Sequence, residues 1–405
     1  MKIAIIGAGA AGFFAAINCR QYHPESDITI FEKSSKLLAK VKISGGGRCN
    51  VTNNCHQISE LLKSYPRGAK HLKKAFHQFK VADTIDWFEM RGVPLKIESD
   101  GRMFPKSNDS QTIINCLVQH AREGNIKIHL NAPISAIDKT PNGNYTLECN
   151  GKHEIFDKVI VATGGSPKMR GFEWIRRLGH SINSPVPSLF TFNLPKDPIT
   201  ALMGVVVESA LVRIQGTKLK QSGPLLITHW GMSGPAILKL SAWGARGLEK
   251  MGYSFNVQVN WVSGETENII REKLDKNIIE GGKRKVINLN PFGIPSRLWE
   301  FLLAKAGLDK DSTWNSHGKK NLNRLINVLT NDVYPVRGKT TFKEEFVTCG
   351  GINLSEVDFN TMESKINKGL YFAGEILDID GITGGFNFQA AWTTGYIAGK
   401  LRSSG

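Results

Sequence analysis

Short apolar runs alternate with glycine-rich and amphipathic stretches at the start of the chain. Ile3–Ile6 is an apolar run that predicts a buried strand, and a glycine-rich turn and a helical pattern to about Arg20 follow it. Asp27–Phe31 predicts the next strand, which ends on Glu32. A strand, a helix and a strand of these lengths predict a βαβ unit with parallel strands.

Two helical patterns and a set of short strands come next. Residues 70–91 predict one helix with aromatic side chains on its core face, and Ser110–Glu123 predicts another. Lys127–Leu130 predicts a further parallel strand, and Lys158–Ala162 predicts a buried one. Between these two strands, alternating segments joined by Asn-Gly turns predict an antiparallel meander over 132–138, 144–150 and 153–156.

The character of the chain changes near four prolines in the segment 184–198. The following part is strand-like, with strands predicted at 204–209, 211–215, 225–228 and 254–261, and residues 265–330 are helical and basic. The end of the chain returns to the first pattern, with a strand at Leu370–Ala373, a glycine-rich loop and a helix from Asn387 to about Leu401. We therefore expect a Rossmann-type α/β domain with two insertions, divided as 1–190, 191–264, 265–333 and 334–405.

Composition narrows the class of protein. A chain of 405 residues exceeds what one hydrophobic core usually supports, and its 41% apolar and 22% charged residues are ordinary for a soluble protein. No apolar run approaches the roughly 18–20 residues of a membrane helix, and the first residues form a strand pattern without a signal peptide, so we expect a cytoplasmic protein. Six scattered cysteines without a C-x-x-C pair argue against a disulfide framework and against a metal site.

The formal charge is the strongest anomaly of the composition. Lysine and arginine number 52 and aspartate and glutamate 36, which gives +16, and such an excess attracts RNA, DNA or an anionic membrane, although many soluble proteins are simply basic. The cations cluster, because residues 61–82 contain six of them and no acid, and residues 271–324 contain twelve against six acids. The candidate RNA contacts are Lys63, Arg67, Lys70, Lys73, Lys74, Lys283, Arg284, Lys285, Lys319 and Lys320.

The first glycine-rich turn has the pattern of a dinucleotide site. Gly7-x-Gly9-x-x-Gly12 follows a strand and opens a helix, and Glu32 lies twenty residues beyond Gly12 at the end of the next strand. The glycines allow a tight turn, and the N-terminus of the helix offers free N–H groups to a pyrophosphate. Glu32 can accept hydrogen bonds from ribose hydroxyls.

A C-terminal segment supplies the features that a nicotinamide-only domain does not need. Acids and glycines precede the last helix there, which predicts a flavin-facing helix terminus. Asp380 can hold a ribityl hydroxyl, and amides from Gly384 to Asn387 can face the pyrimidine carbonyls of a flavin. FAD is therefore the expected cofactor, and no metal is expected.

The glycine run in Lys42–Asn53 is predicted to be a loop that forms a second clamp on FAD. Its glycines allow close approach of the backbone, Arg48 can neutralise phosphate, and Asn50 and Thr52 can bond ribityl or flavin-edge atoms. The complete set of predicted FAD contacts is Gly7, Gly9, Ala10, Ala11, Gly12, Glu32, Lys33, Lys42, Ser44, Gly45, Gly46, Arg48, Cys49, Asn50, Thr52, Ile134, Ala162, Thr163, Gly164, Gly374, Glu375, Asp380, Gly381, Gly384, Gly385, Phe386 and Asn387.

Several motifs together resemble one family. The segments MKIAIIGAGAAG, KISGGGRCNVTN, ATGG, THWGMSGPAIL, TCGGI and AGEILDIDGITGGFNFQAAWTTG resemble those of the BaiN/RdsA-type bacterial NAD(P)/FAD-dependent oxidoreductases, and the resemblance covers essentially the whole chain. It implies a glutathione-reductase-like FAD-binding domain with an inserted β-rich subdomain and a helical subdomain. Family members have been linked to reduction of a uridine in large-subunit ribosomal RNA to dihydrouridine and to reduction of enones in bile-acid-type substrates, so the family implies the cofactor more firmly than the substrate.

Two classes of substrate stay open. The clustered charge favours a uridine of 23S ribosomal RNA, with Cys349 and Cys49 as candidate general acids and Trp230, Trp243 or Trp314 as candidate stacking partners, although burial in a core explains each of these side chains equally well. The alternative is a small-molecule oxidoreductase, either an enone or steroid-type reductase or an amine oxidase. NADH or NADPH is the expected electron donor, and a monomer is slightly favoured over an oligomer.

Overall fold

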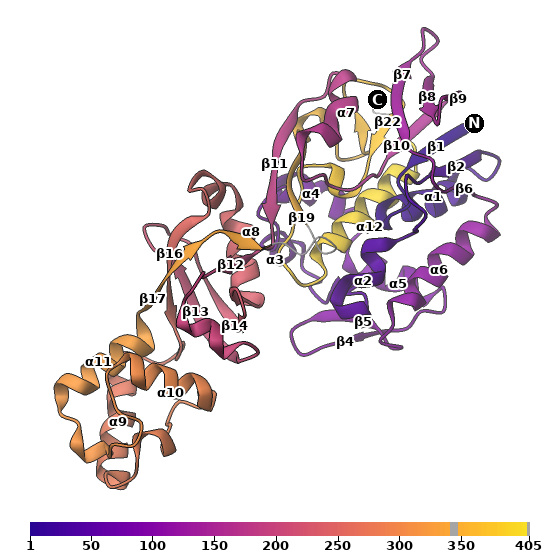
Figure 1. Ribbon diagram of the computed structural model, residues 1–405. Coiled ribbons are helices and arrows are strands. Elements are labelled where there is room, and N and C mark those ends of the chain that lie inside the picture. Colours follow the sequence, from indigo (N-terminus) through magenta and orange to yellow (C-terminus); the bar gives the residue numbers. More distant parts are fainter. Residues whose placement is uncertain (341–346, 403–405) are drawn as a thin grey trace. The chain divides into compact units, whose positions relative to one another are not determined.

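The computed structural model describes residues 1–340 and 347–402, which fall into two compact units (Figure 1). Unit 1 comprises Met1–Ser188 together with the chain from Phe342 onward, and unit 2 comprises Leu189–Thr341. Each unit has its own buried apolar core. The division of the insertion into a β-rich and a helical subdomain stays a prediction.

A mostly parallel sheet forms the centre of unit 1. In the described part of the chain its order is β20-β21-β22-β10-β1-β2-β6, with β1 between β2 and β10. The strands β22, β10, β1, β2 and β6 are parallel, which confirms the predicted βαβ start and the parallel strand near residue 127. The bounds are β1 Lys2–Ile6, β2 Asp27–Phe31, β6 Lys127–His129, β10 Lys158–Val161, β20 Val357–Asp358, β21 Glu363–Ser364 and β22 Leu370–Phe372.

Two helices from opposite ends of the chain pack closely against each other in unit 1. Helix α1 (Ala10–Tyr22) and helix α12 (Phe386–Gly399) lie side by side in Figure 1. Gly395 of α12 allows this approach, because a Cβ atom there would lie 2.7 Å from the carbonyl oxygen of Ala11. The contact joins the first and last helices of the unit into one core.

The remaining elements of unit 1 surround this sheet and helix pair. The predicted meander is confirmed as the antiparallel strands β7, β8 and β9, and Phe156 at its end meets Phe31 of β2 edge-to-face. A two-stranded sheet pairs β11 with β19, and a small sheet has the order β3-β5-β4. The bounds are α2 Ala39–Gly47, β3 Thr52–Asn53, α3 Ile58–Leu62, α4 Ala69–Phe76, α5 Val81–Glu89, β4 Leu95–Ile97, β5 Arg102–Pro105, α6 Ser110–Glu123, β7 Ile134–Lys139, β8 Tyr145–Cys149, β9 Lys152–Phe156, α7 Glu173–Arg177, β11 Ile182–Ser188 and β19 Val347–Ile352.

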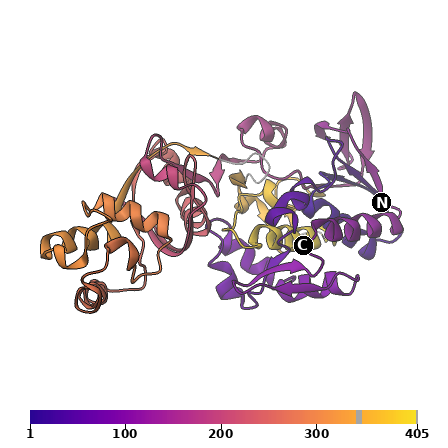
Figure 2. The same ribbon diagram turned by 60° about the horizontal axis from the view of Figure 1, so that its bottom comes forward.

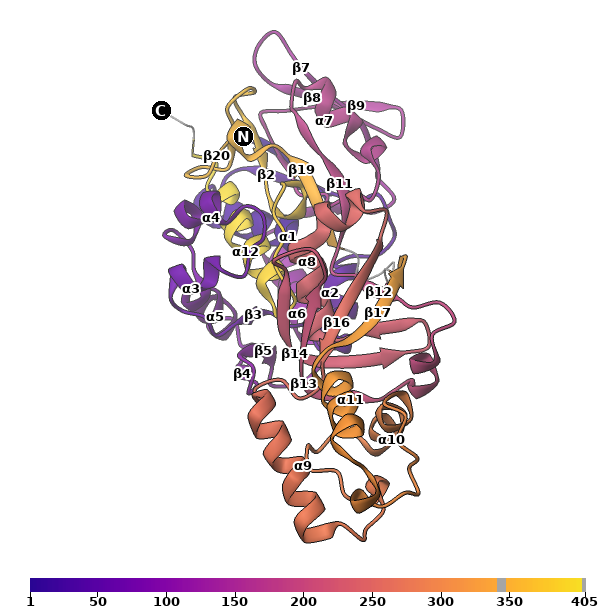
Figure 3. The same cartoon turned by 90° about the vertical axis from the view of Figure 1, so that its left-hand side faces the viewer.

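Unit 2 is built on an antiparallel sheet with helices packed on it. The order within the described residues is β17-β16-β13-β14-β15-β12-β18, and helices α9, α10 and α11 gather at one end of the unit in Figures 2 and 3. One apolar core joins these helices to the sheet. The bounds are β12 Thr191–Asn193, β13 Val206–Ile214, β14 Lys220–Thr228, β15 Gly231–Ser233, α8 Pro235–Lys250, β16 Ser254–Asn260, α9 Glu267–Gly281, α10 Ser296–Lys305, α11 Lys319–Thr330, β17 Asp332–Arg337 and β18 Lys339–Thr340.

Four predicted elements differ from the structure. The single helix over 70–91 is two helices, because Asp83 accepts a hydrogen bond from the Lys80 N–H and starts α5 anew. The two strands at 204–209 and 211–215 are one strand, β13, with an irregular register between Val207 and Ala210. The strand-like part contains a helix of 16 residues, α8. The glycine run expected as a loop contains α2, although Ser44, Gly45 and Gly46 within it leave the helical conformation.

Candidate functional site

Four segments that the sequence singled out meet at one edge of the parallel sheet. The Gly7–Gly12 turn follows β1, Glu32 follows β2, Ala162–Gly164 follows β10, and Gly374 with Glu375 follows β22. Strand β1 pairs with β2 on one side and with β10 on the other, so the connections after neighbouring strands run in opposite directions from β1. Ligands of open α/β sheets bind outside the carboxyl ends of the strands at such a switch point, so this edge is the candidate site.

The turn between β1 and α1 leaves a clear space at the start of the helix. Gly7 has φ of +108°, and a Cβ atom on Gly12 would overlap the carbonyl oxygen of Gly7, so both positions require glycine. Gly9 is the N-cap of α1, and the first turn has neither a side-chain cap nor an acidic residue. A Cβ atom at Gly9 would meet no other heavy atom of the described residues within 4 Å. The free N–H groups at this terminus, which include those of Ala10 and Ala11, fit a pyrophosphate.

Backbone groups fix the carboxylate of Glu32 beside this turn. One oxygen accepts a hydrogen bond from the Ala8 N–H at 3.0 Å, and the other accepts from the N–H and the hydroxyl of Ser34 at 2.9 and 2.8 Å. A carboxylate offers about four acceptor positions, so these three donors leave one for a ribose hydroxyl. Lys33 is exposed next to it, and Ile134 is half-buried at the start of β7.

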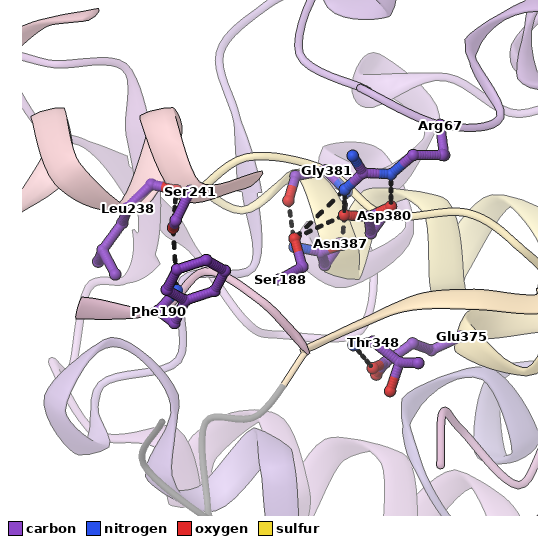
Figure 4. A network of polar contacts seen from close by, with 10 residues as sticks. All are labelled: Arg67, Ser188, Phe190, Leu238, Ser241, Thr348, Glu375, Asp380, Gly381 and Asn387. Carbon is purple, nitrogen blue, oxygen red and sulfur yellow. Dashed lines mark hydrogen bonds and ion pairs between the residues drawn. The ribbon is translucent and has the colours of Figure 1, made fainter. Parts of the chain in front are cut away.

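The end of β22 carries a second anchored acid, Glu375. One of its oxygens accepts a hydrogen bond from the Thr348 N–H at 2.9 Å, and the other forms an ion pair with the Lys40 ammonium at 2.7 Å (Figure 4 shows Glu375 and Thr348). Thr348 lies in β19 and its hydroxyl is buried without a hydrogen-bond partner among the described residues. Sequence reasoning found Glu375 but missed Lys40 and Thr348, because nothing local marks them as its neighbours.

The glycine run places its side chains differently from the prediction. The Arg48 guanidinium, expected to neutralise phosphate, forms an ion pair with Glu98 at 2.6 Å and lies over the Phe104 ring. Lys42 is exposed and donates to Gln111, and the Ser44 hydroxyl donates to the Val41 carbonyl. The backbone is left-handed at Gly45 and Gly46. A Cβ atom built on Gly46 would meet no heavy atom of the described residues within 4 Å.

The residues after the glycine run hold the loop that leads into α12. The Thr52 hydroxyl is buried and donates to Gln389 at 2.6 Å. The side-chain oxygen of Asn50, in the amide orientation that satisfies both of its polar atoms, accepts from the Gly385 N–H at 2.9 Å. The predicted contacts of Asn50 and Thr52 with the ribityl chain stay predictions, and the polar atoms of both side chains bond within the protein.

The loop before α12 is held by its own bonds as well. The Asn387 side chain accepts from the Gly381 N–H at 2.8 Å and donates to the Gly381 carbonyl at 3.0 Å (Figure 4). The Tyr65 hydroxyl donates to the Phe386 carbonyl at 2.7 Å. Gly385 is the N-cap of α12, whose first turn contains no acid, so nothing in that turn repels an anionic group. Gly384 lies in the same loop.

A buried ion pair beside this loop joins two residues for which the sequence predicted ligand contacts. Asp380, expected to hold a ribityl hydroxyl, is fully buried, and its carboxylate is bound by the Arg67 guanidinium and the Ser188 hydroxyl (Figure 4). Arg67, expected to contact RNA, has a side chain that is only 15% exposed because it pairs with Asp380. Burial outweighs the opposing effects of Arg67 and Ser188 and raises the pKa of the Asp380 carboxyl.

Both candidate acid cysteines are buried. Burial raises the pKa of the Cys49 thiol to about 12, so this thiol stays protonated at neutral pH and is a weak acid, and it has no exposed surface. Cys349 lies in β19 opposite Val186 and directly after Thr348. It is therefore next in sequence to the residue whose N–H binds the anchored acid Glu375.

The candidate RNA contacts vary in how available they are. Lys63 pairs with Glu60 and Lys285 pairs with Asp311, both at the surface. Trp314, a candidate stacking side chain, is fully buried in the core of unit 2, whereas Trp243 is 40% exposed. Among the candidate RNA contacts, those that are exposed and form no ion pair with a described residue are Lys70, Lys73, Lys74, Lys283, Arg284, Lys319 and Lys320.

The sheet edge fits FAD better than it fits a metal. An open helix terminus, an acid with one remaining acceptor position and a second acid beyond the switch point match the pyrophosphate, ribose and ribityl parts of that cofactor. Within residues 1–340 and 347–402, no group of three or more potential metal ligands lies together. The helices described there include none long and apolar enough to cross a membrane.

Comparisons with known proteins agree with this fold. The model of the HI0933-like protein Rossmann domain matches residues 1–401. The chain is 29% identical over 406 residues to the ribosomal RNA dihydrouridine synthase of Escherichia coli, covering 98% of this chain and 96% of that protein. It is 27% identical over 415 residues to the 3-dehydro-bile acid delta(4,6)-reductase of Clostridium scindens, covering 98% of each.

Two solved structures are similar in fold at low sequence identity. The open conformation of a flavocytochrome c3 fumarate reductase has a TM-score of 0.51 at 16% identity, over 99% of this chain and 77% of that chain. The 3-ketosteroid-delta4-(5alpha)-dehydrogenase from Rhodococcus jostii RHA1 has a TM-score of 0.50 at 13% identity, over 98% and 96% of the two chains. With the family match, these likenesses confirm the predicted Rossmann-type FAD-binding fold.

Proposed function

The chain belongs to the HI0933-like Rossmann family of FAD-dependent oxidoreductases, and we propose that it reduces a uridine of 23S ribosomal RNA to dihydrouridine. The observation that carries the choice of RNA is the charge of +16, with exposed cations in both clusters that the sequence identified. The relative from Escherichia coli that bears the name of this activity aligns over nearly the whole chain, which supports the proposal.

The reaction adds a hydride to C6 of the uracil ring and a proton to C5. Bound FAD would supply the hydride after its own reduction by NADH or NADPH. The N-terminus of α1 would hold the pyrophosphate, Glu32 the adenosine ribose, and the Glu375 region the ribityl chain, because these groups meet at the edge of the sheet. The loop before α12, which follows the Glu375 segment along the chain, would fix the position of the flavin ring at the N-terminus of that helix.

Cys349 is the candidate donor of the proton to C5. It follows Thr348, whose N–H binds Glu375, so it lies in the strand that borders the site. A thiol can give up a proton to carbon and regain it from solvent. Cys49 is the second candidate; burial raises the pKa of its thiol to about 12, which makes it a weak acid.

A second function, reduction of an enone in a steroid-like molecule, is favoured by the bile-acid reductase of Clostridium scindens, which aligns over as much of the chain. The two functions are separated by offering the FAD-loaded protein both substrates with NADH or NADPH. The first substrate is unmodified 23S ribosomal RNA, with dihydrouridine detected by nucleoside mass spectrometry, and the second is a 3-keto steroid enone. Dihydrouridine is the expected product. Turnover of the enone without dihydrouridine would establish the second function.

A further inference from the structure

Helix α4 presents a row of lysines to solvent. Lys70, Lys73 and Lys74 are exposed and stand at positions i, i+3 and i+4, which share one side of a helix. The opposite side is apolar and buried, with Leu72, Ala75 and Phe76 in the core of unit 1. No acid occurs between residues 61 and 82, and the described residues form no ion pair with these three lysines.

A lysine from a distant part of the chain extends this row. His71, half-buried on α4, has its pKa lowered first by burial and then by the positive charges of Lys70, Lys365 and Lys74. Lys365 is exposed and follows β21, and the His71 ring lies against Phe359 with centroids 5.2 Å apart. The α4 cationic face, made of Lys70, Lys73, Lys74 and Lys365, is therefore a local concentration of positive charge built from two segments.

The segment just before α4 is bonded to the loop that leads into α12. Arg67 pairs with the buried Asp380, and the Ser64 carbonyl accepts a hydrogen bond from the Ile382 N–H at 2.9 Å. The Tyr65 hydroxyl donates to the Phe386 carbonyl. These three links fix the start of α4 against the loop that would hold the flavin ring.

We propose that the α4 cationic face binds phosphates of the RNA substrate and that the links through Tyr65 and Arg67 hold it beside the flavin loop. This inference rests on the proposed function. RNA fits this face better than a membrane does, because the apolar side of α4 is used in the core and offers nothing for insertion into lipid. Lysine ammonium groups act as point charges for a phosphate backbone, and no ion pair among the described residues occupies those of α4.

The test compares two variants of the full-length protein loaded with FAD. In the first, Lys70, Lys73 and Lys74 are replaced together by glutamine. In the control, the same change is made at three exposed lysines of unit 1 that stand on other segments, Lys106, Lys139 and Lys152. Flavin absorbance and thermal unfolding show that both variants keep the cofactor and the fold. Binding to a transcript from 23S ribosomal RNA is measured by fluorescence anisotropy over a range of salt concentrations.

Each phosphate contact contributes about 0.7 to the slope of log affinity against log salt for a single strand, so the first variant loses about 2 from the slope. Over a roughly fourfold increase in salt, its affinity then falls about 20-fold less than that of the wild type. The control keeps the slope of the wild type. An unchanged slope in the first variant, or an equal loss in the control, overturns the proposal.

The failure of this inference is distinguishable from failure of the proposed function. If the slope of the first variant is unchanged while the wild type forms dihydrouridine, the reductase assignment stands and the phosphate face is rejected. If the slope falls but no dihydrouridine forms, the phosphate face stands and the reductase assignment is rejected. Binding of the wild type to phosphatidylserine vesicles and not to the transcript rejects the face as an RNA contact.

Discussion

Replacing Arg67 by methionine is expected to destabilise unit 1 strongly. Asp380 has no exposed surface and Arg67 is its cationic partner, so the substitution leaves a buried carboxylate with only the Ser188 hydroxyl. Removing one partner of a buried ion pair costs about 3–5 kcal/mol. For a unit of roughly 250 residues each kcal/mol lowers the melting temperature by about 2–4 °C, so the expected loss is roughly 6–20 °C.

The assay is thermal unfolding followed by circular dichroism at a fixed excess of FAD, because bound cofactor itself raises stability. A surface pair in the same segment is the control. Lys63→Met breaks the bond to Glu60, but both side chains are more than half exposed, so the loss is at most about 1 kcal/mol. The double variant Arg67→Met/Asp380→Leu removes both charges and is expected to lose less than the sum of the two single changes. An Arg67→Met variant as stable as the Lys63→Met variant, or strict additivity in the double variant, would refute the reasoning.

Three further predictions concern the cofactor turn, a buried histidine and the cysteines. Gly9→Ala is expected to lower FAD affinity but to leave the apoprotein as stable as the wild type, because its Cβ enters open space. Gly12→Ala is expected to lower both FAD affinity and stability, because its Cβ overlaps the Gly7 carbonyl. Calorimetry with and without FAD checks both expectations. Burial lowers the pKa of His180, so the unfolded chain binds the proton more readily and the free energy of unfolding falls as the pH drops below about 6.5. Urea unfolding of a His180→Gln variant should show a smaller decrease of this free energy over the same pH range. Cys349→Ala lowers kcat without loss of FAD, whereas Cys49→Ala leaves kcat unchanged, and the reverse result would exchange their roles.

The parts of the fold that follow from local pattern were predictable from the sequence. Strands β1 and β2, with the glycine turn after β1 and Glu32 after β2, belong to one βαβ unit. Periodicity and glycine spacing are therefore enough to predict them. Helix α8 was missed although it carries a start signal, Pro235 at its first turn after Gly234. Gly244 and Gly247 inside it lower helix propensity, and the neighbouring strands suggested more strand.

The bonds that organise the site were not predictable, because they join residues far apart in the chain. Arg67 and Asp380 are 313 positions apart, and nothing near Arg67 distinguishes it from the exposed lysines that follow it. Lys40 and Glu375 are 335 positions apart. Residue type and spacing suggested ligand contacts for Arg67 and Asp380, whereas their burial in the folded unit makes them partners of each other.

The central claim is tested most directly by mapping dihydrouridine in 23S ribosomal RNA from cells that lack this protein. We expect one dihydrouridine to disappear on deletion and to return with the wild-type protein. It should not return with the Gly9→Ala variant, which retains its fold but binds FAD weakly. Survival of every dihydrouridine in the deletion strain would contradict the claim.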